Sequence, residues 1–575
     1  MLALVALATL AATGEPAEGY EDRLIDWGLG QYGLTREPQP EGKKVDRIEV
    51  AAENVFSPSD PWPEFLNIFH WQTKEAVIRR ELLLAPGDTW TQAKVEETER
   101  NLRRLVILGV AKVVAGKDKD GKLVMLVVAK DRWSLRLNWD YLIVGNVLEY
   151  LHVPLTEINF LGRGQTLTID PLLKLDTFQL GEQFYEPRLL GSKVSLNESA
   201  AIVLNRQTGK PEGTSGIVQV LRPLWSLDQE WSFNTFATWD VRRTRVFRGA
   251  QIWQLGYPNE TSPTSSVPYV YDSRNIEVDA LVTRSFGRAW KIDVTGGVGG
   301  YTRSYEPPKE TPLDPTVKTW FKNNWLPRSE DATYLYGLLT LFKADYRVLR
   351  DIDEFALSED FQIGPRLITG FKWAIPTFAK SNFGEVAGSF RYRVYAYDNL
   401  LAVYLGAFAR FVPDGPPVNE HFLAQVIDYS PRIEGGRFVV RLLADYRVRD
   451  LDNHQVLLGG GSGLSGAAPE LLAGRNELLA NIEYRTKPFE IQTVYVGFVL
   501  FYDAGAAYDV KPAFVHTVGL GLRILLPQLN RDVIRIDLGF VVGDRSATAG
   551  LSPDRFNSSF GQVSQIQPDF FDDPI

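Results

Sequence analysis

The 575-residue chain contains no cysteine, and its formal net charge is -9. The first absence excludes disulfide bonds, thiolate metal sites and a cysteine nucleophile. The acidic balance argues against nucleic acid as the main partner. After the N-terminal start, no run of about 18 apolar residues occurs, so a membrane-spanning helix is not expected. The five histidines are not spaced like metal ligands; they are His70, His152, His421, His454 and His516.

Other chemical signals are also missing. No phosphate-binding loop appears, and "GSGLSGA" lacks both the final glycine and the strand-turn-helix context of a nucleophile elbow. We therefore expect no cofactor, no metal and no enzyme activity.

The N-terminus "MLALVALATLAATG" is a short apolar run that ends in small residues. This pattern predicts a signal peptide over residues 1–14, although no Lys or Arg precedes the apolar run. The alternative is a buried N-terminal helix. Residues 15–43 are polar and rich in Gly and Pro, which predicts a linker.

Residues 44–132 carry the pattern of a small α+β domain. A short strand near Val50 is followed by two helical segments, "TKEAVIRRELLLAPGD" and "TQAKVEETERNLRRLVILG". The turn "KDKDG" then separates two apolar strands. The predicted order is strand, helix, helix, strand, strand.

From residue 133 to about 565, apolar and polar residues alternate with period two, the mark of strands with unlike faces. In "VGFVLFYDAG" one face holds Phe498, Leu500 and Tyr502, and the other holds Val499, Phe501 and Asp503.

The apolar faces span about nine to eleven residues, the length that a tilted strand needs to cross a bilayer. Aromatic residues make up 12% of the chain, which suits aromatic girdles. At about 27 residues per strand and connection, the region predicts an antiparallel β-barrel of about 16 strands. Residues 566–575 would form a C-terminal tail. The alternative is a large soluble β-protein.

Several segments resemble known families. "VIRRELLLAPGDTW" and "ETERNLRRLVILGVAKVV" resemble a POTRA domain, here in one copy. Together with "LTEINFLGRGQTLTID", "LLGGGSGLSGAAPELLAGRNELLANIEYR", "VGFVLFYDAGAAY" and "HTVGLGLRILLPQLNRDVIRIDLGF", in that order, they resemble the BamA/TamA superfamily of bacterial surface-antigen-type barrels.

The resemblance implies a protein of the outer membrane of a Gram-negative bacterium, with its POTRA domain in the periplasm. It implies an assembly and insertion factor whose partners are outer-membrane lipid, unfolded client polypeptides and periplasmic accessory proteins. Clients would add to the edge strand of the POTRA sheet. A lateral seam would lie between the first barrel strand, about 133–142, and the last, about 556–565.

The resemblance also implies a lid loop that folds into the lumen, here Gly463, Leu464, Ser465 and Gly466. Ser465 stands where the family carries an Arg, and Ala467 where it carries an aromatic residue. Asp503, the expected wall acid, therefore lacks its usual partner. Arg475 or Arg441 could replace that partner, or Asp503 could be an ordinary wall acid.

Other wall residues complete the predicted site. Gly505 and Gly497 would leave room for the loop, and Glu483 and Arg485 would share the lumen wall with Asp503.

Two other functions remain open at this point. One is a polypeptide secretion or surface-display pore, in which the client passes through the lumen. The other is a structural surface-antigen barrel with no client, which the missing Arg makes more credible. A single POTRA copy favours a specialised or accessory role.

Overall fold

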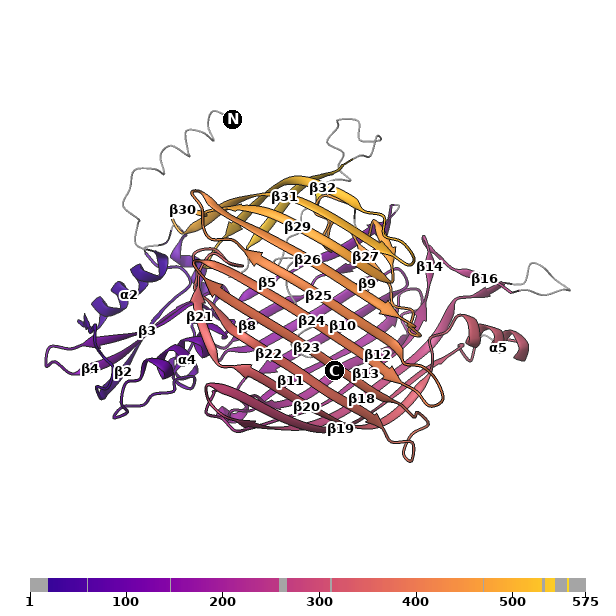
Figure 1. Cartoon of the computed structure of the whole chain (residues 1–575), viewed down its shortest axis with the longest axis horizontal. Helices are drawn as coiled ribbons and strands as arrows, with labels where there is room; N and C mark the ends of the chain where they lie inside the picture. Colours follow the sequence, from indigo (N-terminus) through magenta and orange to yellow (C-terminus); the bar gives the residue numbers. More distant parts are fainter. Residues whose placement is uncertain are drawn as a thin grey trace.

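The computed structural model describes residues 19–58, 60, 62–144, 146–257, 266–310, 313–468, 470–529, 533–542 and 556–557. A small α+β domain precedes a closed antiparallel barrel. Figure 1 shows the small domain at one end of the barrel. The fold class that the sequence predicts is confirmed, as is the fold that the resemblance implies. The predicted signal peptide and the C-terminal tail lie outside the described residues.

The small domain is POTRA-like, and its strands and helices follow the predicted order. Its four-stranded sheet has the order β1-β3-β4-β2, in which β2 and β4 are parallel. The elements are β1 (Thr35–Arg36), β2 (Val45–Glu53), η1 (Glu64–Phe69), α3 (Glu75–Arg79), α4 (Gln92–Arg103), β3 (Leu108–Lys117) and β4 (Leu123–Asp131).

Residues 15–43 differ from the predicted linker, because they contain the helix α2 (Tyr20–Gln31) and the strand β1. Every residue of β4 is buried. Alternate β4 residues such as Met125 pack with α3 and α4, whereas Leu126 and Val128 pack with α2. A Cβ on Gly28 would lie 2.8 Å from Val128 Cγ2, so the helix approaches the sheet closely. The sheet is thus covered on both faces.

The barrel is one long antiparallel sheet that closes on itself. Its first half comprises β5 (Leu135–Leu137), β6 (Asp140–Val144), β7 (Val147–His152), β8 (Leu155–Phe160), β9 (Gln165–Lys174), β10 (Thr177–Glu186), β11 (Ser195–Asn205), β12 (Pro211–Arg222), β13 (Trp231–Arg245), β18 (Val270–Phe286) and β19 (Trp290–Glu306), with the short helix η2 (Leu189–Gly191) between β10 and β11.

The second half continues the same meander. It comprises β20 (Glu330–Lys343), β21 (Asp345–Leu349), β22 (Glu359–Ala374), β23 (Gly384–Ala396), β24 (Asn399–Phe411), β25 (Val418–Tyr429), β26 (Gly436–Val448), β29 (Asn476–Thr486), β30 (Phe489–Ile491), β31 (Val494–Tyr508), β32 (Val515–Leu525), β33 (Ile534–Val541) and β34 (Phe556–Asn557).

Some of these segments continue one another along a single strand: β5 with β6, β7 with β8, β20 with β21, and β29 with β30. Counted in this way, about 19 strands precede β34. The number is somewhat above the expected 16 because several connections are very short. The hairpin between β23 and β24, for example, turns through Tyr397 and Asp398 alone.

The predicted alternation separates the two faces of the barrel. In β31, Phe498, Leu500 and Tyr502 are exposed on the outer face, whereas the residues between them are buried on the inner face. Among the described helices, none is long and apolar enough to span a membrane.

The POTRA-like domain spans one mouth of the barrel, which we call the near end. It bonds to turns and strand ends distributed around the rim. The contacts are Lys74 N to Gly162 O (2.9 Å), Arg188 Nε to Glu81 (2.8 Å), Arg103 to Asp360 (2.6 and 2.8 Å), Arg23 to Glu490, and Gln528 Nε2 to Asp60 (2.9 Å).

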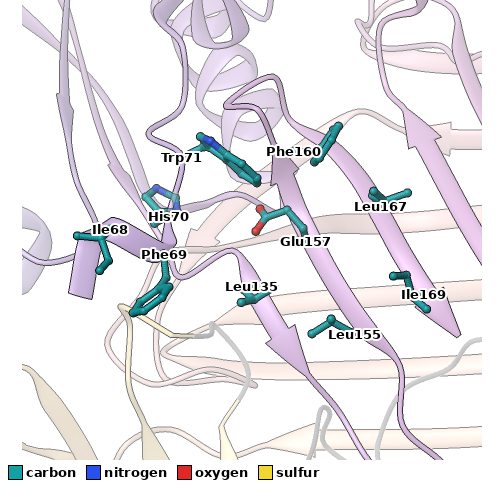
Figure 2. Close-up of a pocket in the computed structure, with 10 residues that line it drawn as sticks. All are labelled: Ile68, Phe69, His70, Trp71, Leu135, Leu155, Glu157, Phe160, Leu167 and Ile169. Atoms are coloured by element: carbon teal, nitrogen blue, oxygen red, sulfur yellow. The ribbon is translucent and has the colours of Figure 1, made fainter. Parts of the chain in front are cut away.

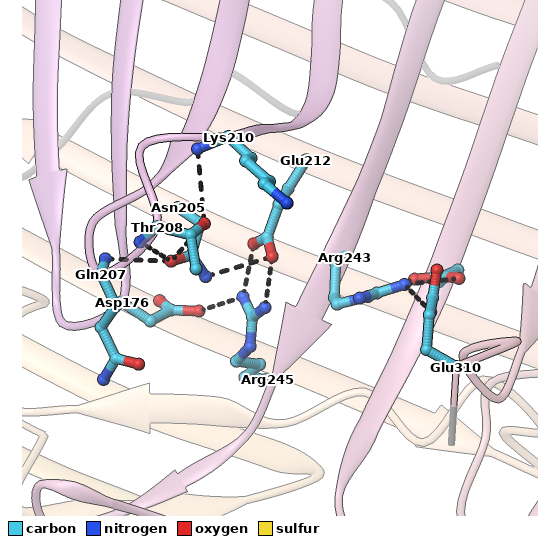
Figure 3. A network of polar contacts seen from close by, with 10 residues as sticks. Asp176, Asn205, Gln207, Thr208, Lys210, Glu212, Arg243, Arg245 and Glu310 are labelled. Carbon is cyan, nitrogen blue, oxygen red and sulfur yellow. Dashed lines mark hydrogen bonds and ion pairs between the residues drawn. The ribbon is translucent and has the colours of Figure 1, made fainter. Parts of the chain in front are cut away.

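The opposite end carries the larger loops (Figure 1). They contain β14 (Phe247–Arg248), β15 (Gln251–Ile252), β16 (Gln254–Gly256), β17 (Ser266–Pro268) and α5 (Pro315–Asn324). A polar network joins strand ends there (Figure 3). Arg245 binds Glu212 on the neighbouring strand and reaches Asp176, in the turn between β9 and β10, at 2.7 Å. Arg243 binds Asp272 on β18 and Glu310 beyond β19. These ion pairs brace the rim across several hairpins.

Helix α2 connects the POTRA-like domain to the barrel through a buried acid. Glu21 accepts hydrogen bonds from Ser358 N (3.1 Å) and Ser358 Oγ (2.8 Å) and forms ion pairs with Lys112 and Arg350. Burial raises the pKa of Glu21, but Lys112, Arg350 and the Ser358 hydroxyl outweigh it, so the pKa lies below its usual value.

We expect Glu21→Gln to lower the free energy of unfolding by about 3 kcal/mol at neutral pH, because it takes the anion from the partly buried Lys112 and an acceptor oxygen from the buried Ser358. A folded-state pKa below the unfolded value stabilises the protein above the usual carboxyl pKa. The difference from wild type should therefore disappear as the pH falls below 4.5. Chemical unfolding followed at several pH values measures it. The control is Glu96→Gln, an exposed acid on α4; an equal effect there would contradict the assignment.

Candidate functional site

The loop that joins β26 to β29, residues 449–475, contains the predicted lid residues Gly463 to Gly466, and we call the whole loop the lid loop. It lies against the inner wall of the barrel. Two short strands, β27 (Val456–Leu458) and β28 (Leu472–Gly474), pair within it. Leu464, which is fully buried, packs with Leu458, Ala467 and the wall residue Leu479. An apolar contact therefore seats the centre of the loop on strand β29.

Asp503 binds the lid without a cation among its hydrogen-bond donors. Its Oδ2 accepts a hydrogen bond from the backbone N–H of Ser465 at 2.8 Å, and its Oδ1 accepts one from Asn481 Nδ2 at 2.7 Å. The carboxylate is 1% exposed. Asn481 also donates to Gly463 O at 2.7 Å, so one amide connects wall acid and lid. A buried carboxylate needs such donors.

The two arginines considered as partners of Asp503 bond to other residues. Arg475 contacts Asp509, and Arg441 donates to Gln425 at 3.1 Å. Asn481 is the residue that sequence reasoning missed. It lies directly opposite Asp503 in the register of β29 and β31, so strand alignment could have indicated it.

Glycines allow the lid to touch the wall. Gly466 has φ +78°, and a Cβ there would lie 2.2 Å from Gly539 Cα on β33. A Cβ on Gly505 would lie 2.8 Å from Leu458 and 3.0 Å from Leu464. Gly463, at φ +125°, similarly faces Leu479. The structure therefore places Gly463, Gly466 and Gly505 at points where backbone and lid approach closely.

Gly497 has a different neighbour from the expected one. A Cβ on it would lie 2.8 Å from Phe355, in the turn between β21 and β22. This inner turn, residues 350–358, folds into the near mouth. Tyr429 donates to Asp353 at 2.6 Å, and Arg485 Nη1 donates to Ile352 O at 3.0 Å. In the sequence, Ile352, Phe355 and Leu357 stand among acidic residues of this turn. These apolar residues could have indicated that the turn is buried.

Glu483 and Arg485 form an ion pair at 2.7 Å on the inner wall. Through Arg485 they contact the inner turn, whereas Asp503 and Gly505 contact the lid. The predicted wall residues thus divide between two segments that enter the lumen from opposite ends. Nearby, Asp537 pairs with Arg523 and Arg535, at 2.5 and 2.7 Å.

Two further clusters have the residue types of a catalytic triad or of a metal site. Ser134 Oγ and Asp131 Oδ2 each lie 3.0 Å from a ring nitrogen of His70. The His70 side chain and Ser134 are 0% exposed, so substrate cannot reach the hydroxyl and the set is structural. In the lid loop, possible ligand atoms of Asp450, Asp452 and His454 lie within 4.8 Å of one another. They stand at the surface, where acidic groups are common without a metal.

No protein-family model and no curated protein matches the sequence. Solved structures with some likeness include BamA from Haemophilus ducreyi lacking POTRA domains 1-3, with 12% identity, TM-score 0.31 and coverage of 91% of this chain and 88% of that one. CdiB from Acinetobacter baumannii has 11% identity, TM-score 0.38 and coverage of 92% and 76%. CdiB from Escherichia coli has 12% identity, a TM-score of 0.39, and coverage of 92% of this chain and 78% of that one. All three TM-scores are below 0.5, so they establish neither family nor function.

We expect Gly466→Ala to release the lid from the wall. The added Cβ would meet the backbone of Gly539, and the positive φ adds about 1–2 kcal/mol of strain. In planar bilayers the variant should conduct more ions than wild type. Gly461→Ala is the matched control, because a Cβ there meets nothing within 4 Å in the same loop. Equal conductance of the two variants would contradict the predicted seating.

We expect Asp503→Ala to weaken the same seat by about 2–6 kcal/mol, since the buried donors Ser465 N and Asn481 Nδ2 lose their acceptor at about 1–3 kcal/mol each. Asp503→Asn, which keeps one carbonyl oxygen, should lose less. Hydrogen exchange at the lid amides measures the effect. If Asp503→Ala left the protection of Ser465 unchanged, the hydrogen bond would not hold the lid.

Proposed function

We propose that the chain is an outer-membrane assembly factor of the BamA/TamA superfamily. Its POTRA-like domain receives client polypeptides in the periplasm and passes their strands to a lateral seam of the barrel. No covalent chemistry is involved. Two features support this function: the order of the motifs in the sequence and the arrangement of the two domains.

One observation carries the proposal. One of the contacts between the POTRA-like domain and the barrel rim lies where the first barrel strand passes the turn after β32. Gln528 in that turn donates to Asp60 at 2.9 Å, and its carbonyl accepts from the N–H of Trp133, just before β5, at 2.6 Å. In this proposal the POTRA-like domain is periplasmic and lies beside the two ends of the sheet, between which a client strand would enter.

The lumen supports a lateral route. The lid closes on the inner wall from one end, and the inner turn and the POTRA-like domain occupy the other. A strand that joins the sheet edge needs neither segment to leave. A polypeptide secretion pore, the second candidate, needs both to move, so a stable open channel would favour it.

The POTRA edge strand β2 is occupied by side chains. Its carbonyl oxygens of Ile48, Val50 and Ala52 accept hydrogen bonds from Arg79 (3.0 Å), Tyr32 (2.8 Å) and Gln72 (3.1 Å). A client strand that added to β2 would have to replace these donors. Strand addition would thus be an exchange of hydrogen bonds at an edge that is protected in the absence of client.

The test is depletion of the protein, followed by quantitative proteomics of the outer membrane. We expect a defined set of barrel proteins to be lost and to return when the wild-type chain is supplied. The remaining outer-membrane proteins serve as the internal control.

Other outcomes would replace the proposal. An intact membrane that lacks one secreted or surface protein would identify a secretion pore. No change in either fraction would indicate a structural barrel without a client.

A further inference from the structure

A compact group of exposed apolar side chains lies in the POTRA-like domain. The apolar wedge, residues 62–71, contains η1, and its sequence is "WPEFLNIFHW". Exposed side chains in it, with their exposed fractions, are Trp62 (36%), Phe65 (65%), Ile68 (74%), Phe69 (56%) and Trp71 (45%). Single exposed apolar residues are ordinary, but a contiguous group marks an interaction surface.

The exposure is built into the fold, because polar groups hold the wedge from behind. Asn67 exchanges hydrogen bonds with the backbone of Phe56, at 2.8 and 3.2 Å. His70 bonds to Asp131 and Ser134. Asn159 on β8 donates to Trp71 O at 2.7 Å. Asn67 and His70 are thus used internally, whereas the five apolar side chains and Glu64 are exposed.

The wedge lies outside the barrel, against the start of its first strands (Figure 2). A cleft of about 360 Å³ separates it from the wall. Register places Leu135, Glu157 and Leu167 in one row across β5, β8 and β9. The cleft is lined by Ile68, Phe69, His70, Trp71 and Phe160 and by wall residues that include Leu135, Leu155 and Ile169.

The wall side of the cleft belongs to the apolar outer belt of the barrel. Along the first strand, Leu137, Trp139, Tyr141 and Ile143 are each more than half exposed. Leu135 and Leu155 on the wall lead from the wedge to this belt across a cleft that Glu157 also lines. Lys74 and Arg163, both exposed, stand beside it.

We propose that the apolar wedge inserts into the periplasmic leaflet of the bilayer around the barrel, and that lipid acyl chains fill the cleft behind it. This inference rests on the membrane location in the proposed function. Aromatic side chains favour the boundary between headgroups and acyl chains. Lys74 and Arg163 would face anionic headgroups.

The position of the wedge would affect the lipid next to the proposed seam. Asp60, just before it, binds Gln528 in the turn after β32, so the wedge lies beside the proposed seam. Apolar side chains inserted there disturb lipid packing at the point where a client strand would enter.

The chain has no cysteine, so single labels are straightforward. The probe is the fluorophore NBD on Ile68→Cys in the full-length protein, in vesicles of phosphatidylcholine and phosphatidylglycerol that carry a bromine- or nitroxide-labelled lipid. The reference inside the belt is Leu500→Cys, at a site 53% exposed on β31. The aqueous reference is Lys119→Cys, in the exposed β3–β4 turn.

We expect the label at position 68 to be blue-shifted and quenched by the labelled lipid at least half as strongly as the label at 500, while the label at 119 is unaffected. Quenching at 500 with position 68 behaving like 119 would overturn the wedge proposal alone. A blue shift at 68 without lipid quenching would mean that a second copy of the chain covers the wedge, which also overturns it. No quenching at 500 would mean that the outer face of the barrel does not contact lipid, and both proposals would then be wrong.

Discussion

Every backbone N–H and C=O group of a strand in lipid must find a partner within the protein, and only a closed sheet provides one for each. The rest of this structure depends on that closure. Because the sheet closes, a strand such as β31 has an apolar outer face and an inner face that lines the lumen. The inner face can then carry charge, such as the pairs that Asp537 forms with Arg523 and Arg535. Once partly dry, these charges need fixed partners, and segments that enter the lumen supply some of them.

The contact between Asp503 and the lid shows how such a need can be met without an opposite charge. A backbone N–H and an Asn amide satisfy the carboxylate. A backbone donor has no side-chain freedom, so it reaches the acid only if the loop lies very close to the wall. Gly466 and Gly539 allow that approach. Ser465, which stands where the resemblance expects an Arg, binds the acid through its main-chain N–H.

Local rules predicted much of the fold. Period-two alternation identified the inner and outer faces, and the order of elements in the small domain followed from helix and turn signals. The helix α2 was missed because its own sequence is weakly apolar, and what holds it is the second face of β4. The run "LVMLVVA" at 123–129 did contain that information, since a strand that is apolar at every position is covered on both faces. Strand number was underestimated because connection lengths vary.

The candidate site was predictable only where contacts follow register. Alternation and resemblance together indicated that Asp503, Gly505 and the lid glycines lie close to one another. They did not indicate that Glu483 and Arg485 contact the inner turn instead of the lid. Whether a wall residue meets the lid or the inner turn depends on its height along the strand, which alternation does not encode. Both segments contact strands β29 and β31, but at different heights. A route through the lumen therefore requires two unrelated rearrangements, whereas a route between the first and last strands requires neither. This asymmetry is the physical reason for preferring lateral transfer to passage through the pore.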